Sequence, residues 1–165
     1  MRKTAVLGML TCAALMLSWA ESFLPIAPTI PGIRLGLANM MVVFCLYRFG
    51  WREAAMINAA RILLSAFLFG NFSVLLYSTM GAVCAFFVML LMKQSGLFST
   101  VGVSIGGGVI HNMAQLLLAM VIVQTVQISF YLPWLLASGC LTGLFNGVAA
   151  NAADRLLPKR FTMKE

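Results

Sequence analysis

Seven polar side chains lie inside or beside long apolar runs of the sequence, and these residues could do chemistry. They are Glu21, Arg34, Asn39, Arg61, His111, Asn112 and Gln115. An ionisable or amide side chain is costly in the lipid core unless a partner satisfies it, so each one is a candidate for a binding site. Two guanidiniums, one imidazole and three amides against one carboxylate suit an anionic or strongly hydrogen-bonding ligand. We therefore predict that these residues bind a small-molecule substrate.

Spacing and depth predict that several of these side chains meet. Asn58 and Arg61 are three residues apart and His111 and Gln115 are four apart, so each pair shares a helix face. Arg61 is eight residues from Glu53, or about 12 Å at the helical rise, which places it near the middle of the membrane. The position of His111 in its own apolar run gives it a similar depth. We expect Arg61 and His111 to form the floor of a pocket.

Each candidate also has a purely structural explanation. Glu21 and Arg34 can pair with each other at the outer membrane surface, and Arg61 can bond to helix carbonyls. His111 and the three amides can brace neighbouring helices without any ligand. The agreement in depth, and not any single residue, favours a shared site.

Composition places the chain in the membrane. Of its 165 residues, 62% are hydrophobic and 9% are charged, and the mean hydropathy is +0.99. Soluble domains are about 45–50% apolar and about 25% charged. The formal charge of +7 comes from Lys and Arg at the ends of apolar runs, which is typical of topology signals and lipid headgroup contacts. We predict an all-α, multi-pass protein of the bacterial cytoplasmic membrane that contacts lipids and no nucleic acid.

Charges, glycines and prolines divide the chain into six predicted transmembrane helices. Their ranges are 4–24, 35–49, 53–69, 72–92, 98–124 and 131–154. Nine Lys and Arg residues fall in or beside the segments that are inside if the N-terminus is cytoplasmic, and Arg34 alone falls in the outer loops. We therefore predict that both termini are cytoplasmic. The run Gly106–Gly108 and the spacing Gly143-x-x-x-Gly147 indicate close helix contacts.

The first outer segment, 25–34, carries prolines at positions 25, 28 and 31. Proline removes a backbone donor and fixes φ, so we expect an ordered, non-helical cap over the bundle. A cleaved signal peptide is the alternative for the N-terminal run, but that run is long for one and favours a retained helix. The whole chain, 1–165, is then a single integral membrane domain.

The segment Pro31-Gly32-Ile33-Arg34-Leu35-Gly36-Leu37-Ala38-Asn39, with Glu21 and Pro25 before it, resembles a known bacterial membrane family. That family is labelled both heptaprenyl diphosphate synthase component I and Gx transporter. Further matches are Arg61, Tyr77-Ser78 with Gly81, Ser104-Ile105-Gly106, His111-Asn112-x-x-Gln115, and Gly143 with Asn146-Gly147. The resemblance runs from about residue 5 to about residue 150. The family favours Lys where this chain has Arg34.

This family looks like the substrate-binding S components of energy-coupling-factor (ECF) vitamin transporters. The resemblance implies an S-component-like bundle of six helices, with a first outer loop that covers the ligand. It also implies partners that this chain does not contain, namely a coupling membrane protein and two ATPases. The family's association with flavin- and quinone-linked electron transfer makes a flavin- or quinone-related ligand a further expectation.

We therefore predict a substrate-binding membrane subunit for uptake of a small anionic or polar compound. The alternative is a non-catalytic membrane subunit, component I, of heptaprenyl diphosphate synthase or isoprenoid-quinone metabolism. Prenyl diphosphate synthases hold magnesium diphosphate with clustered aspartates, whereas Asp154 is the one aspartate of this sequence. We predict no catalytic residue, no metal ligand and no cofactor.

Overall fold

The fold consists of helices, in a computed structural model that describes residues 2–21, 23, 36–69 and 72–156. The α-helices are α1 (Arg2–Glu21), α2 (Asn39–Arg48), α3 (Trp51–Phe69), α4 (Phe72–Ser95), α5 (Thr100–Val123) and α6 (Leu132–Leu156). A 3₁₀ helix, η1 (Val126–Tyr131), leads into α6. The described residues form no strand. The predicted all-α fold class is therefore confirmed.

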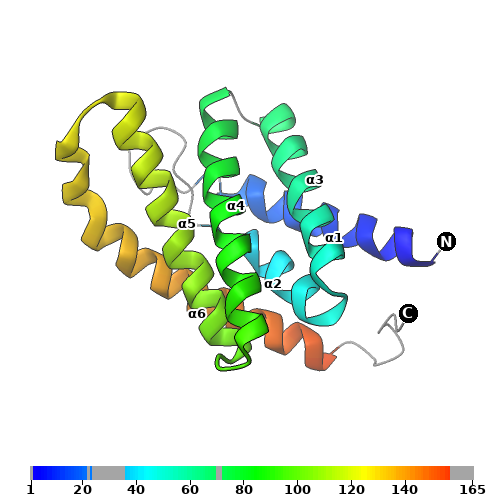
Figure 1. Ribbon diagram of the computed structural model, residues 1–165. Helices are drawn as coiled ribbons and strands as arrows, with labels where there is room; N and C mark the ends of the chain where they lie inside the picture. Colours follow the sequence, from blue (N-terminus) through cyan, green and yellow to red (C-terminus); the bar gives the residue numbers. More distant parts are fainter. Residues whose placement is uncertain (1, 22, 24–35, 70–71, 157–165) are drawn as a thin grey trace.

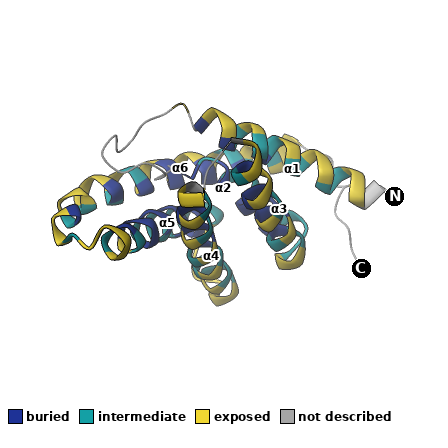
Figure 2. Ribbon diagram, turned by 90° about the horizontal axis from the view of Figure 1, so that it is seen from above, coloured by how far each residue is buried: buried dark blue, intermediate teal, exposed yellow. Residues whose placement is uncertain are grey.

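The short helix α2 occupies the centre of the bundle. It contacts each of the other α-helices, whereas α1 contacts only α2 and α3 among the described elements. In the two views, α3, α4 and α5 form one layer and α1, α2 and α6 form the other (Figures 1 and 2). The buried residues of α2 are Asn39, Val42, Val43, Phe44, Cys45 and Leu46. The described end of the Pro31–Asn39 motif, residues 36–39, therefore leads directly into the centre of the bundle.

The second helix begins later than the sequence predicts. We expected it to run over 35–49, but α2 begins at Asn39. Gly36 has a φ of +83°, a left-handed conformation that ends any helical path through this point. The backbone N–H of Asn39 then donates to the Gly36 carbonyl at 2.9 Å, which forms a tight turn into the helix. With ten residues, α2 is about 15 Å long, or half of the hydrocarbon thickness of about 30 Å.

Four helical segments of the described chain are long and apolar enough to cross a membrane. They are Thr4–Glu21, Leu75–Ser95, Thr100–Val123 and Val126–Leu156. Many large apolar side chains on these helices are exposed, as lipid contact requires. The protein is therefore a multi-pass membrane protein. The count of six spans stays a prediction, because neither α2 nor α3 is among these four segments. The cytoplasmic position of both termini also stays a prediction.

Helices α5 and α6 pack with their backbones in direct contact. A Cβ atom placed on Gly108 would lie 2.4 Å from the carbonyl oxygen of Gly139. A Cβ atom on Gly143 would lie 2.6 Å from the Cα atom of Ile105. Only glycine permits such close approach, which is the usual way in which membrane helices associate tightly. This seam holds α5, and with it the imidazole of His111, at a fixed position relative to α6.

The carboxyl-terminal end of α2 is tied to its neighbours by charged side chains. The ammonium of Lys93 on α4 donates to the carbonyl oxygen of Leu46 at 2.5 Å and lies 5.0 Å from the ring centroid of Tyr47. Arg48 forms an ion pair with Asp154 on α6, at 2.9 Å. These contacts bring the ends of α2, α4 and α6 together. The basic residues Arg48 of α2 and Lys93 of α4 therefore lie at one end of the bundle.

Candidate functional site

The structure buries all of the predicted site residues that it describes. Their exposed fractions are 3% for Glu21, 4% for Asn39, 5% for Arg61, 2% for His111, 1% for Asn112 and 0% for Gln115. Arg34 and the predicted cap over residues 25–34 lie outside the described residues. Burial of this many polar groups is costly unless they are hydrogen-bonded, so the partners of each side chain decide what the group can do.

The guanidinium of Arg61 joins α3 to α2. Its Nη2 donates to the Oδ1 atom of Asn39 and to the Oδ1 atom of Asn58, both at 2.9 Å. Asn58 in turn donates from Nδ2 to the carbonyl oxygen of Ala82 on α4, at 3.4 Å. The two amides thus position a planar cation whose donors match carboxylate or phosphate oxygens.

The imidazole of His111 lies between two glycines. A Cβ atom on Gly81 of α4 would come within 2.9 Å of the ring atom Nδ1, and one on Gly36 would come within 3.3 Å of Cδ2. On its own helix, the Nε2 atom of His111 lies 3.1 Å from Nε2 of Gln115. With this amide nitrogen as the donor, Nε2 of the ring accepts and the ring proton is on Nδ1. The two glycines and Gln115 therefore fix the position of the ring.

Both backbone polar groups of Gly36, the N–H and the carbonyl, are hydrogen-bonded to side chains of other helices. Its N–H donates to Oε1 of Glu21 at the end of α1, and its carbonyl oxygen accepts a hydrogen bond from Nδ2 of Asn146 on α6, at 2.9 Å. A side chain here would also meet Nδ2 of Asn39 at 2.9 Å. The turn before α2 is thus fastened to α1 and α6 where it passes over His111.

Replacing Gly36 by alanine is expected to destabilise the protein more than the same change at Gly96. Both glycines have positive φ, +83° and +69°, and the left-handed conformation costs alanine about 1–2 kcal/mol. A Cβ atom on Gly36 also crowds Asn39 and His111, whereas one on Gly96 meets nothing within 4 Å. Thermal unfolding in detergent would compare the two variants. Equal losses of Tm would show that the turn tolerates a side chain over His111.

Asn112 faces away from this group of residues. Its Nδ2 donates to the carbonyl oxygen of Leu135 at 2.8 Å and to the hydroxyl of Ser138 at 3.0 Å, both on α6. It therefore braces α5 against α6, while its neighbour His111 points toward α2 and α4. The structure brings together Glu21, Asn39, Arg61, His111 and Gln115, and we call these five residues, with Asn58 and Asn146, the buried polar cluster.

Two members of the buried polar cluster, Asn58 and Asn146, were absent from the predicted site. Asn58 is one helical turn before Arg61, so its spacing is a signal that could have included it. Asn146 contacts Gly36 across 110 positions of sequence, and no local spacing indicates such a contact. The role of Gly81 as a wall of the site also depends on the packing of α4 against α5.

Several buried polar atoms of this region have no hydrogen-bond partner among the described residues. They include Nδ2 of Asn39, Nδ1 of His111, Oγ of Ser78 and Oδ1 of Asn146. The great majority of buried polar atoms in proteins are hydrogen-bonded, so each of these is a position where a bound molecule or water would be stabilised. The described part of this region thus contains buried donors and acceptors that its own side chains and backbone leave unsatisfied.

Comparison with known families gives one match. A family model described as heptaprenyl diphosphate synthase component I matches residues 10–153. The chain belongs to this family. The resemblance inferred from the Pro31–Asn39 motif is therefore confirmed. No curated protein and no solved structure matches the chain.

The region matched by the component I family contains the whole buried polar cluster, from Glu21 on α1 to Asn146 on α6. It also contains Gly36, Gly81 and the glycines of the α5–α6 seam. The site and the packing that positions it thus belong to the part of the chain that defines it as a component I protein.

Proposed function

We propose that this component I protein is a substrate-binding membrane subunit that captures a small anionic or polar compound for uptake. The observation that carries the proposal is the buried guanidinium of Arg61, which two amide oxygens hold within the apolar bundle. The planar guanidinium carries paired donors that match the oxygens of a carboxylate or phosphate, which a neutral amide at this position would not provide.

In this proposal, the negative group of the ligand accepts hydrogen bonds from Arg61 and from Nδ2 of Asn39. The Nδ2 atom of Asn39 has no hydrogen-bond partner among the described residues, and the Oδ1 atom of the same side chain accepts from Arg61. His111 and Gln115 orient the polar remainder of the ligand. The proposal also includes Glu21 and Arg34, which flank the three prolines in the sequence, as ligand-binding residues. In this proposal Asn112 braces α5 against α6 and makes no contact with the ligand.

The energy for uptake comes from other chains. The sequence contains no phosphate-binding loop, so we propose that a coupling membrane protein and ATPases of the ECF type associate with this subunit. Flavin- or quinone-related compounds are the first ligands to look for.

A second candidate is favoured by the family description, which names a component of heptaprenyl diphosphate synthase. In this role the protein would be a non-catalytic membrane subunit whose arginines bind a diphosphate. The one aspartate of the sequence, Asp154, is engaged by Arg48, so the magnesium-binding carboxylates would come from another component.

The ligand that stays with the purified protein tests both candidates. Wild type and the isosteric variants Asn39→Asp and Asn112→Asp are purified in mild detergent, and bound small molecules are identified by mass spectrometry. Asn39→Asp keeps the acceptor for Arg61 but replaces the unpartnered donor by a negative charge. We expect about tenfold less ligand per folded protein, because a hydrogen bond to a charged group contributes about 1.5–3 kcal/mol.

Asn112→Asp is the matched control, since it removes the donor that contacts α6 and leaves the buried polar cluster intact. We expect a lower Tm and unchanged ligand content. A water-soluble ligand would support capture for uptake, and a prenyl diphosphate would support the synthase component. Equal ligand content in all three proteins, or no ligand in repeated preparations, would contradict a binding site at Asn39.

A further inference from the structure

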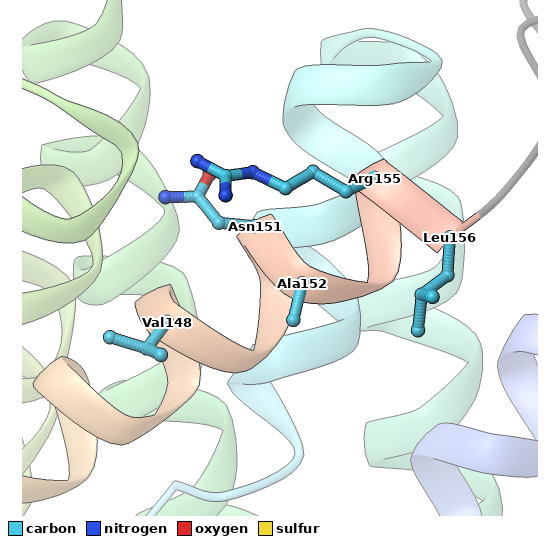
Figure 3. A pocket seen from close by; sticks show the side chains of 5 residues that line it. All are labelled: Val148, Asn151, Ala152, Arg155 and Leu156. Carbon is cyan, nitrogen blue, oxygen red and sulfur yellow. The ribbon is translucent and has the colours of Figure 1, made fainter.

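A second site lies on α6, at the end of the bundle opposite to Gly36. Its pocket has a volume of 410 Å³ and is lined by Val148, Asn151, Ala152, Arg155 and Leu156. Figure 3 shows the side chain of Arg155 extended along the helix toward the amide of Asn151. The proposed function uses none of these residues.

The lining residues form two parallel stripes on the helix. Val148, Ala152 and Leu156 are spaced by four and form an apolar stripe, and Asn151 and Arg155 form a polar stripe beside it. Val148 is 54% exposed and Leu156 is 83% exposed, so the apolar stripe faces the surroundings of the protein. A ligand of this pocket therefore needs an apolar part and a polar part side by side.

The length of the apolar run suggests a depth for the two ends of this pocket. The candidate span Val126–Leu156 ends within the pocket, so we expect Arg155 to lie where the apolar core gives way to headgroups. Val148 is seven residues before Arg155, or about 10 Å along the helix, so we expect it to lie within the hydrocarbon. A ligand with its polar group at Arg155 would then extend its apolar part toward Val148.

Arg155 differs from the other described basic residues at this end of the bundle. Arg48 is paired with Asp154, Lys93 donates to the Leu46 carbonyl, and the Arg52 guanidinium lies 5.5 Å from the ring centroid of Trp51. Within the described ranges, neither Arg155 nor Asn151 has a hydrogen-bond or ion-pair partner.

The neighbouring carboxylate does not compete for Arg155. Asp154 accepts from Nη1 of Arg48 at 2.9 Å, and that ion pair offsets its negative charge. The guanidinium of Arg155 and the amide of Asn151 therefore present donors to a ligand from outside the described chain. Phosphate oxygens suit this combination because guanidinium binds them through paired hydrogen bonds.

We propose that the pocket of Asn151 and Arg155 binds a phosphate-bearing amphiphile. The phosphate accepts hydrogen bonds from Arg155 and Asn151, and the hydrocarbon chain lies along Val148, Ala152 and Leu156. An anionic phospholipid and a prenyl diphosphate share this chemistry. This inference is independent of ligand capture by the buried polar cluster, because that cluster contacts the opposite end of α2.

Native mass spectrometry of the full-length protein in detergent tests the proposal. Phosphatidylglycerol, a prenyl diphosphate and inorganic phosphate are added separately to wild type, Arg155→Gln, Arg52→Gln and Ala152→Trp. Arg52 is the matched control because it is exposed at the same end of the bundle. We expect Arg155→Gln to weaken amphiphile binding about tenfold, as for loss of a charge-assisted hydrogen bond, and Arg52→Gln to leave it unchanged.

The remaining comparisons identify which amphiphile supplies the phosphate and what its hydrocarbon chain contributes. Tighter binding of phosphatidylglycerol assigns the site to membrane lipid, and tighter binding of the prenyl diphosphate assigns it to an isoprenoid ligand. Ala152→Trp fills the apolar stripe and is expected to weaken both. The proposal would be overturned if Arg155→Gln and Arg52→Gln lost affinity for the amphiphiles equally. It would also be overturned if inorganic phosphate bound as tightly as the amphiphiles, or if no amphiphile bound to wild type.

Discussion

Arg61→Ala is expected to abolish retention of the anionic ligand and also to destabilise the protein. The guanidinium is 5% exposed and donates to Asn39 and Asn58, so its loss leaves two buried amide oxygens without this donor. Leaving a buried polar group unsatisfied costs about 1–3 kcal/mol. Interhelical hydrogen bonds in membrane proteins average only about 0.6 kcal/mol, so we expect the loss of stability to lie at the lower end of that range.

The loss of ligand is expected to be larger than the loss of stability. A bidentate contact to a carboxylate or phosphate consists of two charge-assisted hydrogen bonds, and its removal weakens binding on the order of 100-fold. The measurement is titration of the ligand identified by co-purification, with Tm recorded for the same preparations.

Arg61→Lys separates charge from geometry. Lysine keeps the positive charge and can donate to both Asn39 and Asn58 from one nitrogen, as Nη2 of Arg61 does, but it lacks the planar fork that binds a carboxylate or phosphate through two hydrogen bonds. We expect intermediate affinity and nearly normal Tm. Arg52→Ala is the control for a general electrostatic effect, since Arg52 is exposed. If Arg61→Ala lowered Tm while the affinity for the ligand stayed at the wild-type value, Arg61 would be a structural brace only.

Local sequence patterns predicted which residues are in the buried polar cluster better than they predicted the hydrogen bonds that these residues make. Depth in an apolar run and spacing by three or four residues depend only on helix geometry, and they indicated that Arg61, His111 and Gln115 lie inside the bundle. The same geometry separates neighbours by about 100°, which explains why Asn112 faces α6 while His111 faces α2 and α4.

The turn at Gly36 could not be predicted in this way. Its positive φ and its two backbone hydrogen bonds depend on Glu21 and Asn146, which approach only after α1 and α6 pack around α2. The late start of α2 at Asn39 has the same origin. Hydropathy alone extends the helix across Leu35, because an apolar run carries no information about a left-handed glycine inside it.

The second prediction with a large expected effect concerns the contact between α5 and α6. Gly108→Ala is expected to destabilise the protein strongly, because the new Cβ atom would lie 2.4 Å from the carbonyl oxygen of Gly139 and 3.2 Å from the Cα atom of Gly143. These are backbone atoms, so no rotamer change relieves the clash and the two helices must move apart. Overpacking costs about 1–3 kcal/mol, and separation of the helices would also disturb the bonds of Asn112 to Leu135 and Ser138.

Gly8→Ala is the matched control for Gly108→Ala. Both glycines are inside helices, but a Cβ atom on Gly8 of α1 meets nothing within 4 Å. Alanine is better than glycine in a helix interior by about 0.5–1 kcal/mol, so Gly8→Ala is expected to keep or raise Tm.

Thermal unfolding of the two variants in the same detergent separates the steric effect of the new Cβ atom from its effect on helix propensity, because both variants replace glycine by alanine. A large drop for Gly108→Ala alone would establish that the direct backbone contact holds α5 in place. Similar Tm values for both variants would mean that the α5–α6 seam relaxes without cost. His111, which is on α5 one turn beyond Gly108, would then owe its position to Gly36 and Gly81 and not to α6.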